Sequence, residues 1–151
     1  MVKGLKKLDW VPGRQYQILT VSMDWKEGPA EALPVKKHLL ETLGKPEAES
    51  GWHVLTGERS AVEELAGTVG FKYNYLPDRN EFAHGAGLIF LSPKGTVSRY
   101  LYGVEFSPRD LRLALLDASE GRSLSLGDKL TMFCYRYDSN SKGYVLFARN
   151  F

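Results

Sequence analysis

The sequence predicts an α/β fold, because strand-like and helix-like segments alternate along the chain and a hairpin joins two strands near its centre. Its 151 residues fit one domain. With 43% hydrophobic and 25% charged residues, the composition is that of an ordinary globular protein with a sizeable core.

The central stretch, residues 82–102, contains the predicted hairpin. Residues 88–91 (LIFL) form a short apolar run, typical of a strand buried on both faces. Pro93 and Gly95 favour a turn, and a second strand-like run follows it. His84 lies just before the apolar run, beside two glycines that allow a close approach of the backbone. A histidine in such a place is more often a hydrogen-bonded structural residue than a ligand.

In the first third of the chain, residues 1–10 have the pattern of the end of a helix, stopped by Pro12-Gly13. Residues 16–23 predict a strand, and Pro29 opens a helix over residues 30–43, although Pro34 is an alternative start. Residues 47–51 predict a solvated linker. The expected apolar face of this helix comprises Leu33, Val35, Leu39, Leu40 and Leu43.

The next segments are a short strand at residues 52–56 and a helix that Ser60 caps, with Glu63 completing a capping box. Residues 71–76 alternate and predict an edge strand, followed by a turn at residues 77–80. The expected buried stripe of the helix comprises Val62, Leu65, Ala66 and Val69.

The clearest helix begins after Ser107, with Pro108 in its first turn, and ends at Gly121. Two β-prone runs around a polar turn at residues 138–143 then predict a C-terminal hairpin. We therefore divide the chain into a domain of residues 1–127 and a hairpin tail of residues 128–151. The expected apolar face of the helix comprises Leu111, Leu115, Leu116 and Ala118.

Charge and composition exclude several classes of function. A net charge of +2 without a basic block argues against nucleic acid or an anionic membrane as the partner. No apolar run approaches the ~20 residues that span a bilayer, and no apolar leader follows Met1. The single cysteine, Cys134, excludes an intramolecular disulfide.

The order of elements is that of a thioredoxin-like fold with an inserted strand and helix, minus its first strand. Several segments resemble the Sco/SenC family, thioredoxin-like copper chaperones in cytochrome c oxidase assembly: residues 19–24 with Pro29, residues 52–57 (WHVLTG), residues 61–73, and His84 ahead of residues 88–95. The tail resembles an extension in a bacterial branch of the family.

This resemblance implies a protein that, in its complete form, delivers copper to the copper-site subunit of cytochrome c oxidase or reduces its thiols. Complete members are periplasmic or membrane-attached. They bind copper through a Cys-x-x-x-Cys pair and a histidine, which His84 matches. Neither cysteine of that pair is present here, so we expect a chain that starts after the motif.

Copper(I) prefers soft thiolates, so His84 is expected to be a vestigial ligand and the chain to bind copper weakly. Cys134 lies in the tail and has no resolving partner, so we expect no catalytic role for it. The alternative interpretation is a redox-inert thioredoxin-like module that binds another protein. An in-frame Cys-x-x-x-Cys upstream of Met1 would favour the first interpretation.

Other candidate residues have simpler explanations. Asp24 could orient a ligand, but an Asp after a strand more often caps its loop. His38 and His53 are expected at the surface or in packing roles. Tyrosines near basic residues could bind single-stranded nucleic acid, but strand positions explain them more simply.

The missing first strand would lie between the strand at residues 18–23 and the strand at residues 88–91, leaving both with unpaired backbone groups. A second chain, the tail at residues 144–147 or direct pairing of the two strands could close this gap. We expect closure between chains, with the tail hairpin at the interface of a homo-oligomer.

Overall fold

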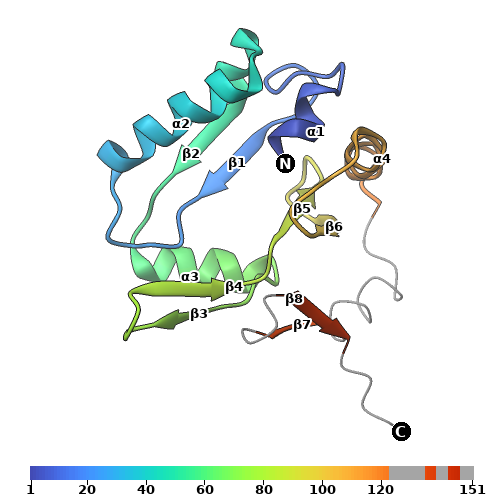
Figure 1. Cartoon of the computed structure of the whole chain (residues 1–151). Coiled ribbons are helices and arrows are strands. Elements are labelled where there is room, and N and C mark those ends of the chain that lie inside the picture. The colour runs from blue at the N-terminus through green and yellow to red at the C-terminus, as the bar shows by residue number, and fades with distance from the viewer. Residues whose placement is uncertain (123–134, 139–142, 147–151) are drawn as a thin grey trace, which may run out of the picture. The chain divides into compact units, whose positions relative to one another are not determined.

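The α/β fold is present in a computed structural model, which describes residues 1–122, 135–138 and 143–146. Its helices and strands group into two compact units. Unit 1 comprises residues 1–71 and 105–112, and unit 2 comprises residues 72–104 and the described residues from 113 onward. The elements (Figure 1) are α1 (Val2–Lys6), β1 (Ile18–Val21), α2 (Pro29–Leu43), a 3-10 helix η1 (Pro46–Gly51), β2 (Trp52–Leu55), α3 (Arg59–Thr68), β3 (Tyr73–Leu76), β4 (Glu81–His84), β5 (Gly87–Leu91), β6 (Val97–Tyr102), α4 (Pro108–Ser119), β7 (Tyr135–Asp138) and β8 (Gly143–Leu146).

Unit 1 is built on the parallel pair of β1 and β2, in which Ile18 is opposite Trp52 and Val21 is opposite Leu55. Side chains alternate between the faces of a strand, so one face carries Trp52 and the other carries Leu55. Trp52 is fully buried, and its indole Nε1 donates to Thr20 Oγ1 at 3.0 Å. Leu55 on the other face is 43% exposed. One face of this pair is therefore covered and the other is open.

Helix α2 begins where Pro29 predicts, because Gly28 is its N-cap and Glu31 accepts the Gly28 N–H at 2.8 Å. Pro34 lies inside the helix, so the alternative start is wrong. The predicted apolar face is partly wrong as well, since Leu33 is 68% exposed. Val35 is also exposed, whereas Ala32 and Leu43 are buried. Which face of α2 is buried depends on its contacts with α1 and β2. Helical periodicity in the sequence does not predict such tertiary contacts.

Residues 47–51 are not a solvated linker. They belong to η1, in which Ala48 is fully buried. A β-carbon on Gly51 would lie 1.8 Å from the backbone N of Gly13, so two segments far apart in sequence touch backbone to backbone here. Glycine is required at this point because no other residue lets two backbones approach so closely.

Helix α3 starts one residue earlier than its predicted cap. Glu58 is the N-cap and its carbonyl accepts the N–H of Val62 at 3.0 Å, so Ser60 lies inside the helix and caps nothing. Val62 and Ala66 are buried as predicted. Leu65, predicted to be buried with them, is 43% exposed.

Unit 2 contains a strand that the sequence did not predict. β4 pairs antiparallel with β3, with His84 opposite Tyr73. The turn between these strands contains Asn80 at φ 50°, a left-handed conformation that asparagine tolerates better than most residues. The glycines that follow residues 81–84 are loop signals, and they hide so short a strand in the sequence.

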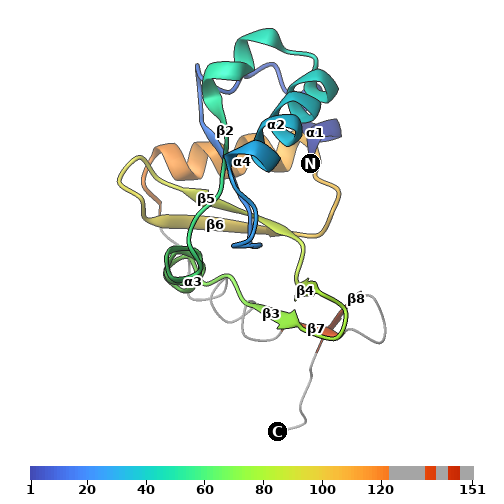
Figure 2. The same cartoon turned by 90° about the vertical axis from the view of Figure 1, so that its left-hand side faces the viewer.

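The central hairpin is confirmed. β5 and β6 pair antiparallel and run side by side in Figure 2, and Gly95 adopts φ 78° in their turn. The Gly95 N–H donates to the Ser92 carbonyl at 2.9 Å. The prediction that residues 88–91 are buried on both faces is wrong: Phe90 is buried, but Leu91 is 38% exposed. β5 is a half-buried strand.

Helix α4 is confirmed at both ends. Ser107 Oγ accepts the N–H of Asp110 at 3.0 Å, and Gly121 adopts φ 67° beyond the last turn. The buried face runs from Leu111 through Ala114 and Ala118, whereas Leu116, which was expected on it, is 39% exposed. Since its first residues fall in unit 1 and the rest in unit 2, α4 crosses the boundary between the units.

The tail contains the predicted hairpin, with β7 antiparallel to β8. Within the described residues every sheet has two strands, so β1 pairs with β2 and β5 pairs with β6. Because β1 belongs to unit 1 and β5 to unit 2, direct pairing of these two strands stays a prediction. Closure between chains stays a prediction as well. None of the described helices is long and apolar enough to cross a membrane.

Candidate functional site

His84, the histidine singled out in the sequence, is the last residue of β4 and is exposed. Its Nδ1 lies 2.9 Å from the carbonyl oxygen of Gly85. A carbonyl only accepts, so Nδ1 carries the proton and donates, and in the neutral imidazole Nε2 carries the lone pair. A backbone carbonyl that holds one ring nitrogen in this way is the usual support of a histidine that binds metal through the other.

Aromatic side chains occupy the same face of the β3–β4 hairpin as His84. Opposite residues of an antiparallel pair point to the same side, so Tyr73 lies next to His84 and Tyr75 next to Phe82. The Phe82 ring is 5.8 Å from the Tyr73 ring, edge to face, and 5.0 Å from the Tyr75 ring. Tyr75 donates its hydroxyl to Asn80 Oδ1 at 2.7 Å. These contacts make a small aromatic cluster on which the histidine sits.

Asp24 caps its own loop, which is the simpler of its two interpretations. Its Oδ1 accepts the N–H of Lys26 at 3.0 Å, while its own N–H donates to Ser22 Oγ at 3.1 Å. Asp24 belongs to unit 1 and His84 to unit 2. A role for this carboxylate in orienting a metal ligand stays a prediction.

The other histidines are at the surface, as expected. His38 is exposed on α2, and His53 is exposed on β2 with Nε2 3.2 Å from Gln17 Oε1. Cys134 lies outside the described residues. In the part of the chain that the structure describes, no three His, Cys, Asp or Glu side chains are grouped so that they could hold a metal ion. Alone, the described residues do not fit a complete copper(I) site.

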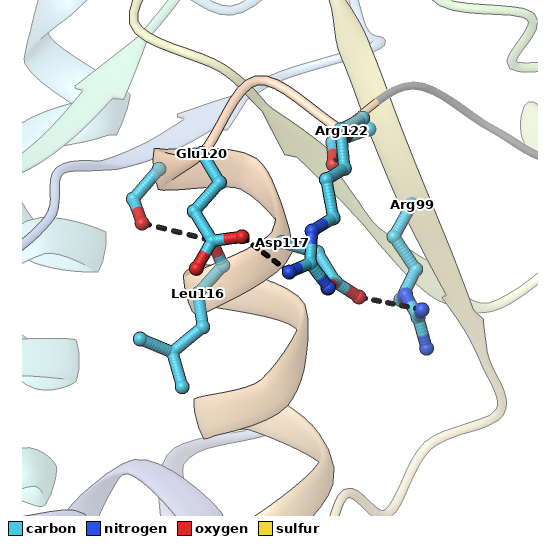
Figure 3. Close-up of polar contacts among 7 residues, drawn as sticks. Arg99, Leu116, Asp117, Glu120 and Arg122 are labelled. Atoms are coloured by element: carbon cyan, nitrogen blue, oxygen red, sulfur yellow. Dashed lines mark hydrogen bonds and ion pairs between the residues drawn. The ribbon is translucent and has the colours of Figure 1, made fainter.

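The sequence did not reveal a cluster of ion pairs in unit 2 (Figure 3). Asp117, 17% exposed on α4, lies 2.5 Å from Arg99 of β6 and 3.2 Å from Arg122. Arg122 also lies 2.5 Å from Glu120, and its carbonyl accepts a hydrogen bond from Ser98 Oγ. The cluster holds the end of α4 on β6. With two arginines and two carboxylates it is balanced in charge, which indicates a structural rather than an anion-binding role.

Two tyrosines have a pKa raised by burial. Burial raises the pKa of Tyr16 to about 12, and in the described structure its hydroxyl is buried without a hydrogen-bond partner. Burial also raises the pKa of Tyr100, whose ring stacks on Tyr102 at 6.2 Å. Tyr100 and Tyr102 are two residues apart on one face of β6, so strand positions explain this part of the tyrosine pattern.

No family model matches the chain, and no curated protein is significantly similar to it. The fold does resemble a solved structure, that of a "putative electron transfer protein" from Aquifex aeolicus VF5. The TM-score is 0.67, the sequence identity is 23%, and the match covers 80% of this chain and 66% of the Aquifex protein. The chain thus spans just under two thirds of that neighbour. A likeness at this identity establishes a shared α/β fold.

Proposed function

We propose that this chain is a Sco/SenC-like domain with a redox-related role, whose complete form hands copper to, or reduces thiols of, the copper-site subunit of cytochrome c oxidase. The observation that carries the proposal is the geometry of His84. An exposed imidazole at the end of β4, with Nδ1 held by the Gly85 carbonyl, has the arrangement of a histidine that binds metal through Nε2. The fold shared with a protein named for electron transfer supports the same class of role.

In this role His84 supplies one ligand of three. Copper(I) needs soft thiolates for tight binding, and the sequence contains one cysteine, Cys134, in the tail. The two thiolates therefore come from outside these 151 residues, either from a longer form of the protein or from the partner. The chain alone has no thiol pair with which to reduce a disulfide.

We expect weak copper(I) binding by the isolated chain, and we expect His84→Ala to remove most of it. The measurement is competition against a chromophoric copper(I) chelator under reducing conditions. His38→Ala is the matched control, because His38 is also exposed but lies on α2 with no role assigned to it. A tight one-to-one site that survives His84→Ala would contradict both the weak binding and the role of His84.

A second candidate function is a redox-inert module that binds another protein. The observation that favours it is the exposure of Leu33, an apolar side chain near the start of α2 that is 68% exposed. Covering such a side chain with a partner removes apolar surface from water, which stabilises the contact. Binding of the oxidase copper-site domain that is independent of copper and of His84, but lost in Leu33→Glu, would favour this module.

A further inference from the structure

The imidazole of His84 has one defined orientation, although the residue is exposed at the end of β4. Its Nδ1 lies 2.9 Å from the carbonyl oxygen of Gly85, the next residue in the chain, so only certain side-chain torsions of His84 bring the two atoms together. An exposed hydrogen bond contributes little net free energy, because water offers both groups other partners. Keeping the ring in this orientation therefore takes a second contact.

Tyr73 is in the position to provide that contact. It is directly opposite His84 in the antiparallel pair of β3 and β4, and opposite residues direct their side chains to the same face. The Cβ atoms of such a pair are about 5 Å apart, a distance at which two rings reach each other. Tyr73 is half-buried whereas His84 is exposed, so the tyrosine is the more firmly placed of the two.

The Tyr73 ring belongs to an aromatic row, formed by Tyr75, Phe82 and Tyr73, that begins at the turn of the hairpin. The Tyr75 hydroxyl donates to Asn80 Oδ1 at 2.7 Å, and the Tyr75 ring is 5.0 Å from the Phe82 ring. The Phe82 ring in turn meets the Tyr73 ring edge to face at 5.8 Å, a preferred geometry for aromatic pairs. The row is fixed at the turn, and His84 lies at its other end.

We propose that Tyr73 is a positioning residue for His84, whose imidazole it keeps turned so that Nδ1 stays on the Gly85 carbonyl and Nε2 carries the lone pair. The value of this orientation for a metal ligand rests on the proposed function, but the orientation itself belongs to the copper-free chain. The contacts of the row are contacts between rings. Phenylalanine should therefore replace Tyr73, and a side chain without a ring should not.

Long-range proton–nitrogen correlation spectra of the copper-free chain, recorded at about pH 8 where histidine is neutral, report which ring nitrogen carries the proton. His84→Ala identifies the signals of His84 among those of the three histidines. In the wild type, a protonated Nδ1 and an unprotonated Nε2 should give two well-separated nitrogen signals. Tyr73→Val keeps a β-prone residue but removes the ring, so both tautomers should exchange and the two signals should move together. Tyr73→Phe should keep the wild-type spectrum.

Asn74→Val is the matched control, because Asn74 is the next residue of β3 and its exposed side chain lies on the opposite face. It should leave the His84 signals in place. Backbone amide shifts verify that the hairpin is folded in each variant. If Tyr73→Val unfolds it, Phe82→Leu takes its place, since it removes the ring that holds Tyr73 and should move the signals in the same direction.

The proposal is overturned if the wild type already gives averaged signals, if the folded ring-deletion variant keeps them apart, or if Asn74→Val moves them equally. Competition for copper(I) separates this result from that of the proposed function. Tyr73→Val should raise the dissociation constant for copper(I) about fivefold, as expected for the loss of one hydrogen bond. Copper binding that His84→Ala leaves unchanged contradicts the proposed function but not the role of Tyr73. Copper binding that is lost in His84→Ala, together with an unaltered tautomer in Tyr73→Val, contradicts the role of Tyr73 alone.

Discussion

The two units connect distant parts of the chain by different means. In unit 1, Lys45 Nζ donates to the carbonyls of Leu5 and Trp10 at 3.0 and 3.1 Å and also to that of Leu8, so one partly buried ammonium serves three backbone acceptors at the end of α1. In unit 2, Asp117 is bound by two arginines that are 42% and 66% exposed. When a substitution removes one partner of such a contact, water takes its place more easily beside an exposed arginine than beside a buried carbonyl.

This difference predicts that single substitutions cost more free energy of unfolding in unit 1 than in unit 2. Unit 1 depends on close contacts between backbone atoms and on carbonyls that a partly buried lysine binds. These groups have no alternative partner when a side chain changes. Unit 2 depends on hairpins that form locally and on ion pairs that solvent screens. Three substitutions test this comparison at neutral pH, and a fourth, Tyr16→Phe, tests a buried group of unit 1 that has no hydrogen-bond partner in the described structure. They are taken from the largest expected effect to the smallest.

The largest effect is expected for Gly51→Ala. The new β-carbon would lie 1.8 Å from the N of Gly13 and 2.2 Å from the carbonyl carbon of Pro12, both backbone atoms that cannot rotate away. Overpacking of this kind should lower the free energy of unfolding by about 3 kcal/mol, measured by urea denaturation. Gly67→Ala is the control, because nothing lies within 4 Å of its β-carbon and alanine favours the interior of α3. Equal stability of the two variants would contradict the backbone contact.

Lys45→Met should cost about 2 kcal/mol, because it keeps the length of the side chain and removes the donor from three carbonyls. Thermal and urea unfolding measure the change. The control is Lys37→Met, which removes a lysine whose side chain is 79% exposed and 4.0 Å from Glu41, and which should change stability by less than about 0.5 kcal/mol. If both substitutions cost the same, the carbonyl contacts of Lys45 contribute little.

Asp117→Asn should cost about 1 kcal/mol, since the carboxylate is 17% exposed but both of its arginines are more open to solvent. The loss should shrink as sodium chloride is raised to about 1 M, where charges are screened within about 3 Å. Lys45→Met should keep its full effect in the same salt, because neutral carbonyls are its acceptors. If Asp117→Asn lowers the free energy of unfolding by more than about 2 kcal/mol, and if this loss does not change with salt, the predicted difference between the units is wrong.

Local chemistry made some of these features predictable. Ser107 and Pro108 predicted the start of α4, because a helix cap depends on about four consecutive residues. Gly95 predicted the β5–β6 turn for the same reason. The buried face of α2 did not follow, since Leu33 and Ala32 are adjacent and contacts with distant elements choose between them. Pro34, which lies inside α2, also suggested a helix start, but the helix begins earlier, at the Gly28 cap.

The candidate site divides in the same way. His84 could be singled out from its neighbours in sequence, but its hydrogen bond to Gly85 and its place in β4 could not, because β4 exists through pairing with β3. The signal for that strand was weak but present: Phe82 alternates with Glu81 and Ala83 after a turn-forming Asn80. The Asp117 cluster was not predictable, since Arg99 is far from it in sequence.

Tyr16→Phe should have the smallest effect at neutral pH and a distinct effect in alkali. The Tyr16 hydroxyl is buried without a partner in the described structure, so removing it leaves no acceptor or donor unsatisfied. Its pKa is raised from 10.0 to about 12 by burial, so between these values the unfolded chain loses the proton while the folded chain keeps it. The stability that the raised pKa of Tyr16 contributes is therefore fully present below pH 10 and is lost as the pH rises through about 12.

Urea denaturation across this pH range should show a steeper decline in the free energy of unfolding for the wild type than for Tyr16→Phe. Tyr75→Phe is the control, because the Tyr75 hydroxyl is hydrogen-bonded and exposed. If the pH profiles of Tyr16→Phe and the wild type are parallel, Tyr16 ionises in the folded chain as it does in water, and the prediction is wrong.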